Sequence, residues 1–222
     1  MSPSRSLPTV VVLAAGGGAR FAGQGPKLAQ RLGAASVLAH TLDAVVSAGL
    51  PVVVVTVSAL VDVARSVVAS RDIVLVPPIG SASREPLGVG FSIASGVGAR
   101  PHAPGWLIMP GDMPLVQPQT LRLVGRALGQ APVAYAQYRG RQGFPVGLSA
   151  ELFSELVQLS GEEGLRRLLV RYPSVAVDVD DAGVLQDINT EADLARARIA
   201  VPESDTVLAW QQPVVAGQSN EA

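Results

Sequence analysis

Short apolar runs rich in valine and isoleucine alternate along this chain with longer segments of helical periodicity. The runs at residues 8–14, 51–57, 73–76 and 105–109 are apolar at nearly every position. A strand with one face in water would alternate polar and apolar residues, so each run is expected to be covered on both faces. Such strands, separated by helices, predict an α/β fold with a mostly parallel twisted sheet and helices on both faces.

The segments between and after these runs predict helices by the spacing of their apolar residues. They lie at residues 36–48, 59–69, 90–98, 117–129, 150–159, 162–171 and 190–199. We expect Ser58 to cap the second helix and Gly49 to end the first. Two stretches, 133–138 and 144–148, predict a hairpin or a strand that returns past a functional loop, and a further strand is expected at 175–179.

No linker divides the chain, so one domain is expected over residues 1–200. The last residues, 201–222, mix Ser, Gln, Gly and Pro and predict a flexible tail.

The composition excludes several classes of function. At 48% hydrophobic and 16% charged residues the chain is expected to fold, and a net charge of −1 argues against binding to nucleic acid or to an anionic membrane. Because the chain has no cysteine and only two histidines, thiolate metal sites and cysteine nucleophiles are excluded. No uninterrupted apolar stretch is long enough to span a membrane, so we expect a soluble, cytoplasmic protein.

A glycine-rich loop follows the first predicted strand. The consecutive residues Gly16, Gly17 and Gly18 would let a phosphate approach the backbone N–H groups, and Arg20 and Lys27 would neutralise its charge. Lys27 is the only lysine among 17 basic residues. The spacing matches neither the P-loop nor the G-x-G-x-x-G pattern, so a flexible turn with an incidental lysine remains the alternative.

Oxygen-bearing side chains follow two other predicted elements. Asp112 comes directly after the strand at 105–109, and the carboxyl ends of parallel strands meet at one edge of a sheet, so Asp112 and Lys27 are expected in one crevice. A carboxylate there is a ligand for Mg²⁺, and a turn-capping role is the alternative. Asp187 and Asn189 are two residues apart on an extended segment and therefore face the same way. Either one could add an oxygen to the same ion.

Weaker signals lie elsewhere in the chain. Ser92 occupies a segment close to the G-x-S-x-G pattern of serine hydrolases, but the last glycine is missing, which disfavours that class. The acidic residues Asp178, Asp180 and Asp181 form either a cation-attracting cluster or a solvated strand end. Arg166 is expected on a helix surface.

Five motifs in order resemble a known family, the nucleotidyltransferases related to the molybdenum-cofactor cytidylyltransferases. The blocks are L-A-A-G-x-x-x-R-F at 13–21 with Lys27, the G-x-G-x-S-I segment at 88–93, D-M-P-L-V at 112–116, and the segments 138–146 and 183–190. Together they extend over nearly the whole chain from Val10 to about Ala200. The resemblance implies a Rossmann-like nucleotidyltransferase fold.

The resemblance also implies an activity and a set of site residues. The activity is transfer of a nucleoside monophosphate, CMP from CTP, to a phosphorylated acceptor, molybdopterin, with release of pyrophosphate and with Mg²⁺ as the cofactor. The implied catalytic residues are Arg20, Lys27 and Asp112. The implied nucleotide-binding residues are Leu13, Ala14, Ala15, Gly16, Gly17, Gly18, Lys27, Gly88, Gly90 and Ser92. The implied metal ligands are Asp112 with Asp187 or Asn189.

Alternative functions stay open at this point. A protein with the same pocket could bind nucleotide or cofactor without turnover and hand the cofactor to a molybdoenzyme. A nucleotidyltransferase could also act on another phosphorylated acceptor, such as a sugar phosphate. Neither alternative needs a protein nucleophile. The first has no turnover, and the second is a phosphoryl transfer, which depends on positioning and electrostatic stabilisation.

Overall fold

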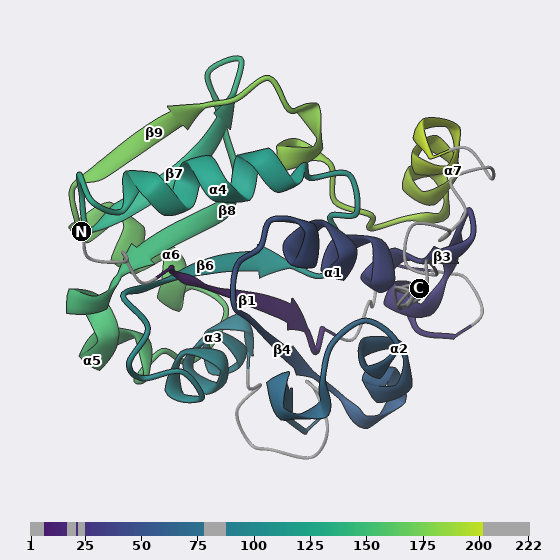
Figure 1. Ribbon diagram of the computed structural model, residues 1–222, viewed down its shortest axis with the longest axis horizontal. Coiled ribbons are helices and arrows are strands. Elements are labelled where there is room, and N and C mark those ends of the chain that lie inside the picture. Colours follow the sequence, from purple (N-terminus) through teal and green to yellow (C-terminus); the bar gives the residue numbers. More distant parts are fainter. Residues whose placement is uncertain (1–6, 17–20, 22–24, 78–87, 202–222) are drawn as a thin grey trace, which may run out of the picture.

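A seven-stranded sheet with the order β5-β4-β1-β6-β8-β7-β9 forms the centre of the molecule (Figure 1). The computed structural model describes residues 7–16, 21, 25–77 and 88–201. The strands are β1 (Thr9–Ala14), β4 (Val52–Thr56), β5 (Ile73–Leu75), β6 (Gly105–Pro110), β7 (Val133–Tyr138), β8 (Arg141–Ser149) and β9 (Ser174–Asp178). Only β8 runs antiparallel to its neighbours in this sheet. The predicted mostly parallel sheet is therefore confirmed.

Helices pack on both faces of this sheet, which explains the apolar character of its strands (Figure 1). The helices are α1 (Val37–Ser47), α2 (Val61–Arg65), α3 (Gly88–Gly98), α4 (Pro118–Ala127), α5 (Phe153–Leu156), α6 (Gly164–Arg171) and α7 (Glu191–Ala200). Val10 and Val12 of β1 face a core that contains side chains of α1 and α4. Val11 faces the opposite core, with side chains of α3, α5 and α6. Alternate side chains of one strand thus enter two cores, so neither face can be polar.

Capping residues mark three helix boundaries, and the sequence predicted the one at Gly49. The Ser36 hydroxyl accepts a hydrogen bond from the Ala39 N–H at 3.2 Å at the start of α1. The chain leaves that helix through Gly49, whose φ of 69° is the left-handed conformation that glycine adopts readily. At the start of α7, Thr190 and Asp193 form a reciprocal capping box.

Two predicted helices are shorter in the structure than their periodicity suggests. Ser58 does not cap a helix over 59–69, because it lies inside a 3-10 turn (Ser58–Leu60) that precedes the five-residue α2. The Ser66 hydroxyl donates to the Val63 carbonyl oxygen at 2.7 Å, and such a bond competes with continuation of a helix. The segment 150–159 likewise forms a 3-10 turn followed by the four-residue α5.

The strands β7 and β8 form the predicted hairpin, whereas a small second sheet was not predicted. This sheet pairs β2 (Arg31–Leu32) with β3 (Ala35–Ser36), and two-residue strands are too short to show a period. The predicted tail, from residue 202 onward, lies outside the described residues. Within the described residues, no helix combines the length and apolar character needed to cross a bilayer.

Candidate active site

The carboxyl end of β1 borders a cleft at one edge of the sheet. Leu13, Ala15 and Gly16 line this cleft, while Ala14 packs into the core on the α1 side. A Cβ atom added to Gly16 would meet nothing within 4 Å, so the space beside the backbone is open there. Gly17, Gly18 and Arg20 lie outside the described residues.

The turn after β6 holds Asp112 beside the end of β1. The Gly111 N–H donates to the Leu13 carbonyl oxygen at 2.9 Å, and the Thr41 hydroxyl of α1 donates to the Gly111 carbonyl oxygen at 2.9 Å. A Cβ atom on Gly111 would lie 3.0 Å from that Leu13 oxygen, so the close approach of the two strand ends requires a residue without one. The backbone that carries Asp112 is therefore fixed from two sides.

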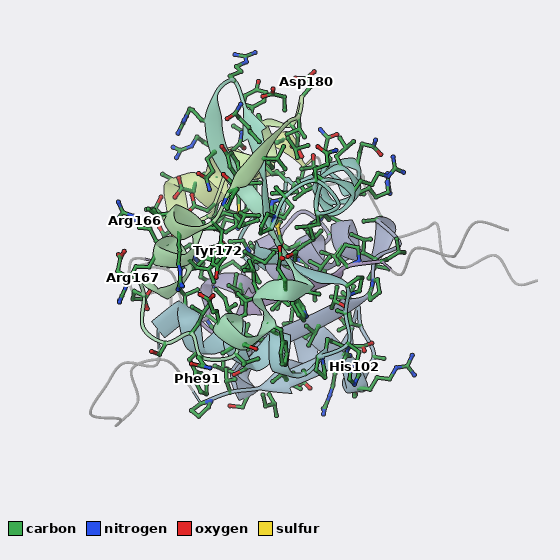
Figure 2. All side chains as sticks on the ribbon, turned by 90° about the vertical axis from the view of Figure 1, so that its left-hand side faces the viewer. Phe91, His102, Arg166, Arg167, Tyr172 and Asp180 are labelled. Carbon is green, nitrogen blue, oxygen red and sulfur yellow. The ribbon has the colours of Figure 1, made fainter. Side chains whose placement is uncertain are left out.

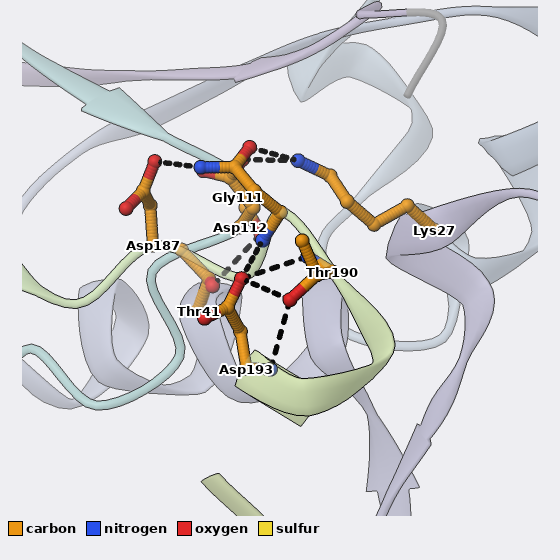
Figure 3. Close-up of polar contacts among 8 residues, drawn as sticks. Lys27, Thr41, Gly111, Asp112, Asp187, Thr190 and Asp193 are labelled. Carbon is orange, nitrogen blue, oxygen red and sulfur yellow. Dashed lines mark hydrogen bonds and ion pairs between the residues drawn. The ribbon is translucent and has the colours of Figure 1, made fainter. Parts of the chain in front are cut away.

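Lys27 reaches Asp112 from a different part of the chain. It begins a 3-10 turn (Lys27–Ala29) whose next residue, Leu28, is buried in the core. The Lys27 Nζ donates to the Asp112 Oδ2 at 2.5 Å, and its distance to the Asn189 Oδ1 is 3.4 Å (Figure 3). The two charged side chains are only 12% and 18% exposed. The expectation that Lys27 and Asp112 share one crevice is confirmed.

Asp187 and Asn189 enter the same cleft from a segment late in the sequence. The Asn189 side-chain amide donates to the Asp187 carboxylate, so the two side chains face the same way as their spacing predicts (Figure 3). The Asp193 carboxylate accepts from the backbone N–H groups of Asn189 and Thr190 at 3.1 and 2.7 Å. The hydrogen bond from the Thr190 hydroxyl holds the pKa of Asp193 below its ordinary value of 3.8. The start of α7 thus anchors this segment.

The cleft consists of two adjoining pockets of about 910 and 700 Å³. Gly16, Asp112 and Phe144 border both of them. The larger pocket also contains Lys27, Asp187 and Asn189, and the smaller one contains Ser92 among mostly apolar side chains. The two pockets therefore share the Asp112 carboxylate, and the smaller one adds a larger share of apolar side chains.

Two buried oxygen atoms in this cleft have no hydrogen-bond partner among the described residues: Asp112 Oδ1 and Ser92 Oγ. Leaving a buried polar atom unpaired costs free energy, so such atoms at a cleft indicate contacts to a ligand. Asp112, Asp187 and Asn189 offer oxygen donors of the kind that a hard divalent cation prefers. In the described part of the chain, no three Asp, Glu, His or Cys side chains are grouped so that they could hold a metal ion by themselves. This partial donor set fits an ion that keeps positions for water and phosphate.

Gly88 and Gly90 do not line the cleft but pack against the turn before α6. A Cβ atom on Gly88 would lie 2.3 Å from the Gly161 carbonyl carbon, and one on Gly90 would lie 2.8 Å from the Ser160 backbone. The Gly90 N–H also donates to the Gly161 carbonyl oxygen at 2.9 Å. These glycines therefore hold two segments together, and the neighbouring Val89 and Ser92 carry the surface that faces the pockets.

Five polar or aromatic lining residues were not assigned as site residues from the sequence. They are Arg141, Gln142 and Phe144 of β8, Glu162 before α6, and Arg166 of α6. Arg166 is exposed on its helix as predicted, and it also borders the smaller pocket (Figure 2). The segment 138–146, one of the five motifs that resemble the family, includes the three β8 residues. Alternation along a strand does not tell which of their side chains faces a ligand.

The acidic cluster near β9 is neither a cation site nor wholly solvated. Asp180 lies at the surface, whereas Asp181 is 3% exposed (Figure 2). The Asp181 carboxylate accepts from the Gln117 N–H at 2.9 Å, the Thr120 hydroxyl at 2.6 Å and the Gly183 N–H at 2.9 Å. It therefore joins the start of α4 to the turn at Ala182–Leu185.

Comparisons with known proteins agree with this arrangement. A family model described as MobA-like NTP transferase domain matches residues 10–176. A curated relative, the bifunctional protein GlmU of Polaromonas naphthalenivorans (strain CJ2), is 34% identical over 128 residues, which cover 54% of this chain and 26% of that protein. The chain thus spans about a quarter of the length of that relative.

Solved structures of similar fold cover most of the chain. Rv0371c from Mycobacterium tuberculosis H37Rv has a TM-score of 0.73 at 28% identity and covers 87% of this chain and 98% of its own. The structure of its complex with manganese has a TM-score of 0.70 at 28% identity, and the match covers 88% of this chain and 100% of that one. A nucleotidyl transferase from Methanothermobacter thermautotrophicus (Mth528) has a TM-score of 0.70 at 25% identity, with 87% and 97% covered.

Proposed function

Because the chain belongs to the family of MobA-like NTP transferase domains, we propose that it transfers a nucleoside monophosphate from an NTP to a phosphorylated acceptor. One domain, residues 1–200, carries this activity in the proposal. The donor we favour is CTP, on the basis of the L-A-A-G opening at Leu13 and the G-x-G-x-S segment at 88–92. The acceptor we favour, on the basis of the family resemblance, is molybdopterin. A molybdoenzyme would receive the product.

The contact between Lys27 Nζ and Asp112 Oδ2, at 2.5 Å inside the cleft, is the observation that carries this proposal. A cation and a carboxylate at the carboxyl ends of the strands are the two charges that a metal-bound triphosphate requires. Lys27 would neutralise phosphate charge, together with Arg20 and the backbone N–H groups of Gly16 to Gly18. Ser92, whose hydroxyl has no partner among the residues that the structure describes, would contact the base or the ribose.

The reaction is a single displacement at phosphorus. An oxygen of the acceptor phosphate attacks the α-phosphorus, a new P–O bond forms, and the bond to the bridging oxygen of the β-phosphate breaks, so that pyrophosphate leaves with the electron pair. No protein nucleophile takes part, and the protein aligns the reactants and stabilises the developing charge.

Asp112, with Asp187 or Asn189, would hold a divalent cation, which we propose to be Mg²⁺. When bound, the cation neutralises charge on the phosphate oxygens. Asp112 Oδ1, which no described residue pairs with, supports this assignment, and so does the manganese complex of Rv0371c. Gly88 and Gly90 would serve the site indirectly, because they pack on the Ser160–Gly161 turn between Ser92 and Glu162, which both border the smaller pocket.

A panel of nucleotides and acceptors tests the proposal. The purified protein is incubated with CTP, GTP, ATP or UTP, with Mg²⁺ or Mn²⁺, and with molybdopterin or a sugar phosphate, and pyrophosphate is measured. We expect release that depends on acceptor, metal and nucleotide, with CTP and molybdopterin the best pair. Tight nucleotide binding without pyrophosphate from any pair would instead favour a cofactor chaperone without turnover.

A further inference from the structure

The hairpin of β7 and β8 carries two arginines with different surroundings. The two turn residues, Arg139 and Gly140, have φ values of 50° and 76°, as expected for a tight two-residue hairpin. The Arg139 guanidinium lies 5.0 Å from the centre of the Tyr138 ring. Arg141, the first residue of β8, borders the larger pocket of the cleft, and Arg139 does not.

Close packing fixes the strand that carries Arg141. A Cβ atom on Gly143 would lie 2.2 Å from the Val184 carbonyl oxygen, so β8 is pressed against the turn that leads to Asp187. Arg141 and Gly143 are two residues apart on one strand and share a face. Arg141 itself is exposed, and it borders the same pocket as Asp112 and Asp187.

Charge pairing leaves Arg141 available to a ligand. The larger pocket contains two cations among the described residues, Lys27 and Arg141. Lys27 is bound to Asp112, whereas the Arg141 side chain makes no hydrogen bond or ion pair to any residue that the structure describes. Only the Arg141 backbone is paired, with Tyr138 in the hairpin. A guanidinium offers five N–H donors in a planar arrangement that matches two phosphate oxygens.

The order of the strands indicates whether Arg141 would bind a phosphate of the nucleotide or the phosphate of the acceptor. β6 lies between β1 and β8, and β8 is antiparallel to β6, so its first residues lie at the edge where β1 and β6 end. Gly16, Asp112 and Arg141 thus follow one another along this edge. In an in-line displacement the attacking and leaving oxygens lie on opposite sides of the phosphorus. With the triphosphate on the β1 side, the attacking group must approach from the β8 side.

We propose that Arg141 binds the acceptor phosphate and makes the protein specific for acceptors that present a phosphate group. This inference rests on the proposed function, because it assumes that the triphosphate occupies the glycine-rich end of the cleft. Arg141 determines specificity by positioning the attacking phosphate, while Lys27 contacts the nucleotide.

Three variants test this role: Arg141→Ala, Arg141→Lys and the matched control Arg139→Ala. Loss of a charged hydrogen-bonding partner predicts an increase of about 10–100-fold in the KM for molybdopterin in Arg141→Ala, with the dissociation constant of CTP unchanged within about twofold. Arg141→Lys should recover part of the loss, because an ammonium retains the charge but not the paired donors. Added guanidinium ion should partly rescue Arg141→Ala, which a purely structural defect would not show.

Direct binding separates this proposal from the proposed function. If the wild-type protein releases no pyrophosphate, the proposed function fails, and binding of molybdopterin and of inorganic phosphate to the CTP-loaded protein then tests Arg141 alone. Binding that weakens in Arg141→Ala but not in Arg139→Ala supports the proposal. Equal binding by wild type and Arg141→Ala, or equal losses in the two alanine variants, would overturn it.

Discussion

The backbone N–H of Ile188 donates to the carbonyl oxygen of Asp112 at 2.9 Å. This bond attaches a late segment of the chain to the end of β6. The Ile188 side chain is buried in the core, so the residues on either side of it, Asp187 and Asn189, turn toward the cleft. One backbone contact therefore brings together oxygen donors that are more than seventy residues apart in the sequence.

Replacement of Lys27 by alanine should lower turnover by about 10²–10³, the effect of removing one preorganised contact to the developing charge. The fold should stay intact, because the lysine side chain lies in the cleft and not in the core. Turnover is compared with that of Arg31→Ala, which removes an exposed arginine outside the cleft. Pyrophosphate release at the wild-type rate in Lys27→Ala would refute the role of the lysine.

Replacement of Asp112 by asparagine should weaken binding of Mn²⁺ by at least about 10–100-fold. Loss of a residue that only hydrogen-bonds to a metal ligand costs that much, and loss of a ligand should cost no less. Of Asp187→Ala and Asn189→Ala, the variant that lacks the second ligand should show a similar loss. Titration calorimetry measures the affinity, with Asp62→Asn as the control because that side chain is 99% exposed. Unchanged affinity in Asp112→Asn would exclude it as a ligand.

Gly90→Ala should lower the free energy of unfolding by about 1–3 kcal/mol, because the new methyl group meets the Ser160 backbone. Gly98→Ala is the control in the same helix. Nothing lies within 4 Å of its Cβ position, so this change should be neutral or stabilise the protein by up to about 1 kcal/mol. Urea unfolding compares the two, and equal stabilities would contradict the packing argument.

Asp181→Ala should destabilise the protein by about 3 kcal/mol, because three donors lose a buried charged acceptor. Asp180→Ala, at an exposed neighbouring position, should change stability by less than about 0.5 kcal/mol. Thermal unfolding and Mn²⁺ titration are measured on both variants. A loss of metal binding with unchanged stability in Asp181→Ala would restore the cation-site interpretation.

The pKa of Asp193 predicts a pH dependence of stability. Its value in the folded state is depressed, mainly by the Thr190 hydroxyl, so the stabilisation is present above the ordinary value of 3.8 and is lost as pH falls through the folded-state pKa. Thr190→Val should raise the Asp193 pKa and reduce this loss on acidification. An NMR titration of the carboxyl group measures the shift, and an unchanged pKa would rule out the capping bond as its cause.

Local chemistry accounts for the elements that the sequence predicted well. The formation of apolar strands such as β1 and of capped helices such as α1 and α7 depends on residues within the same segment. Their periodicity and caps can therefore be recognised in the sequence. The same holds for the placement of Lys27 and Asp112 in one crevice, because parallel strands bring their carboxyl ends to one edge. The shorter α2 and α5 were not predictable, since side-chain hydrogen bonds and turns compete with helix continuation there.

The sequence alone therefore determined the class of fold, the edge of the sheet where the candidate site lies, and three of its charged residues, Lys27, Asp112 and Asp187. Only the tertiary structure decided that Gly88 and Gly90 serve packing, that Asp181 is an internal anchor, and that Arg141 faces the cleft. The physical reason is that these roles depend on contacts between segments distant in the chain. Neither periodicity nor spacing along one segment records such contacts.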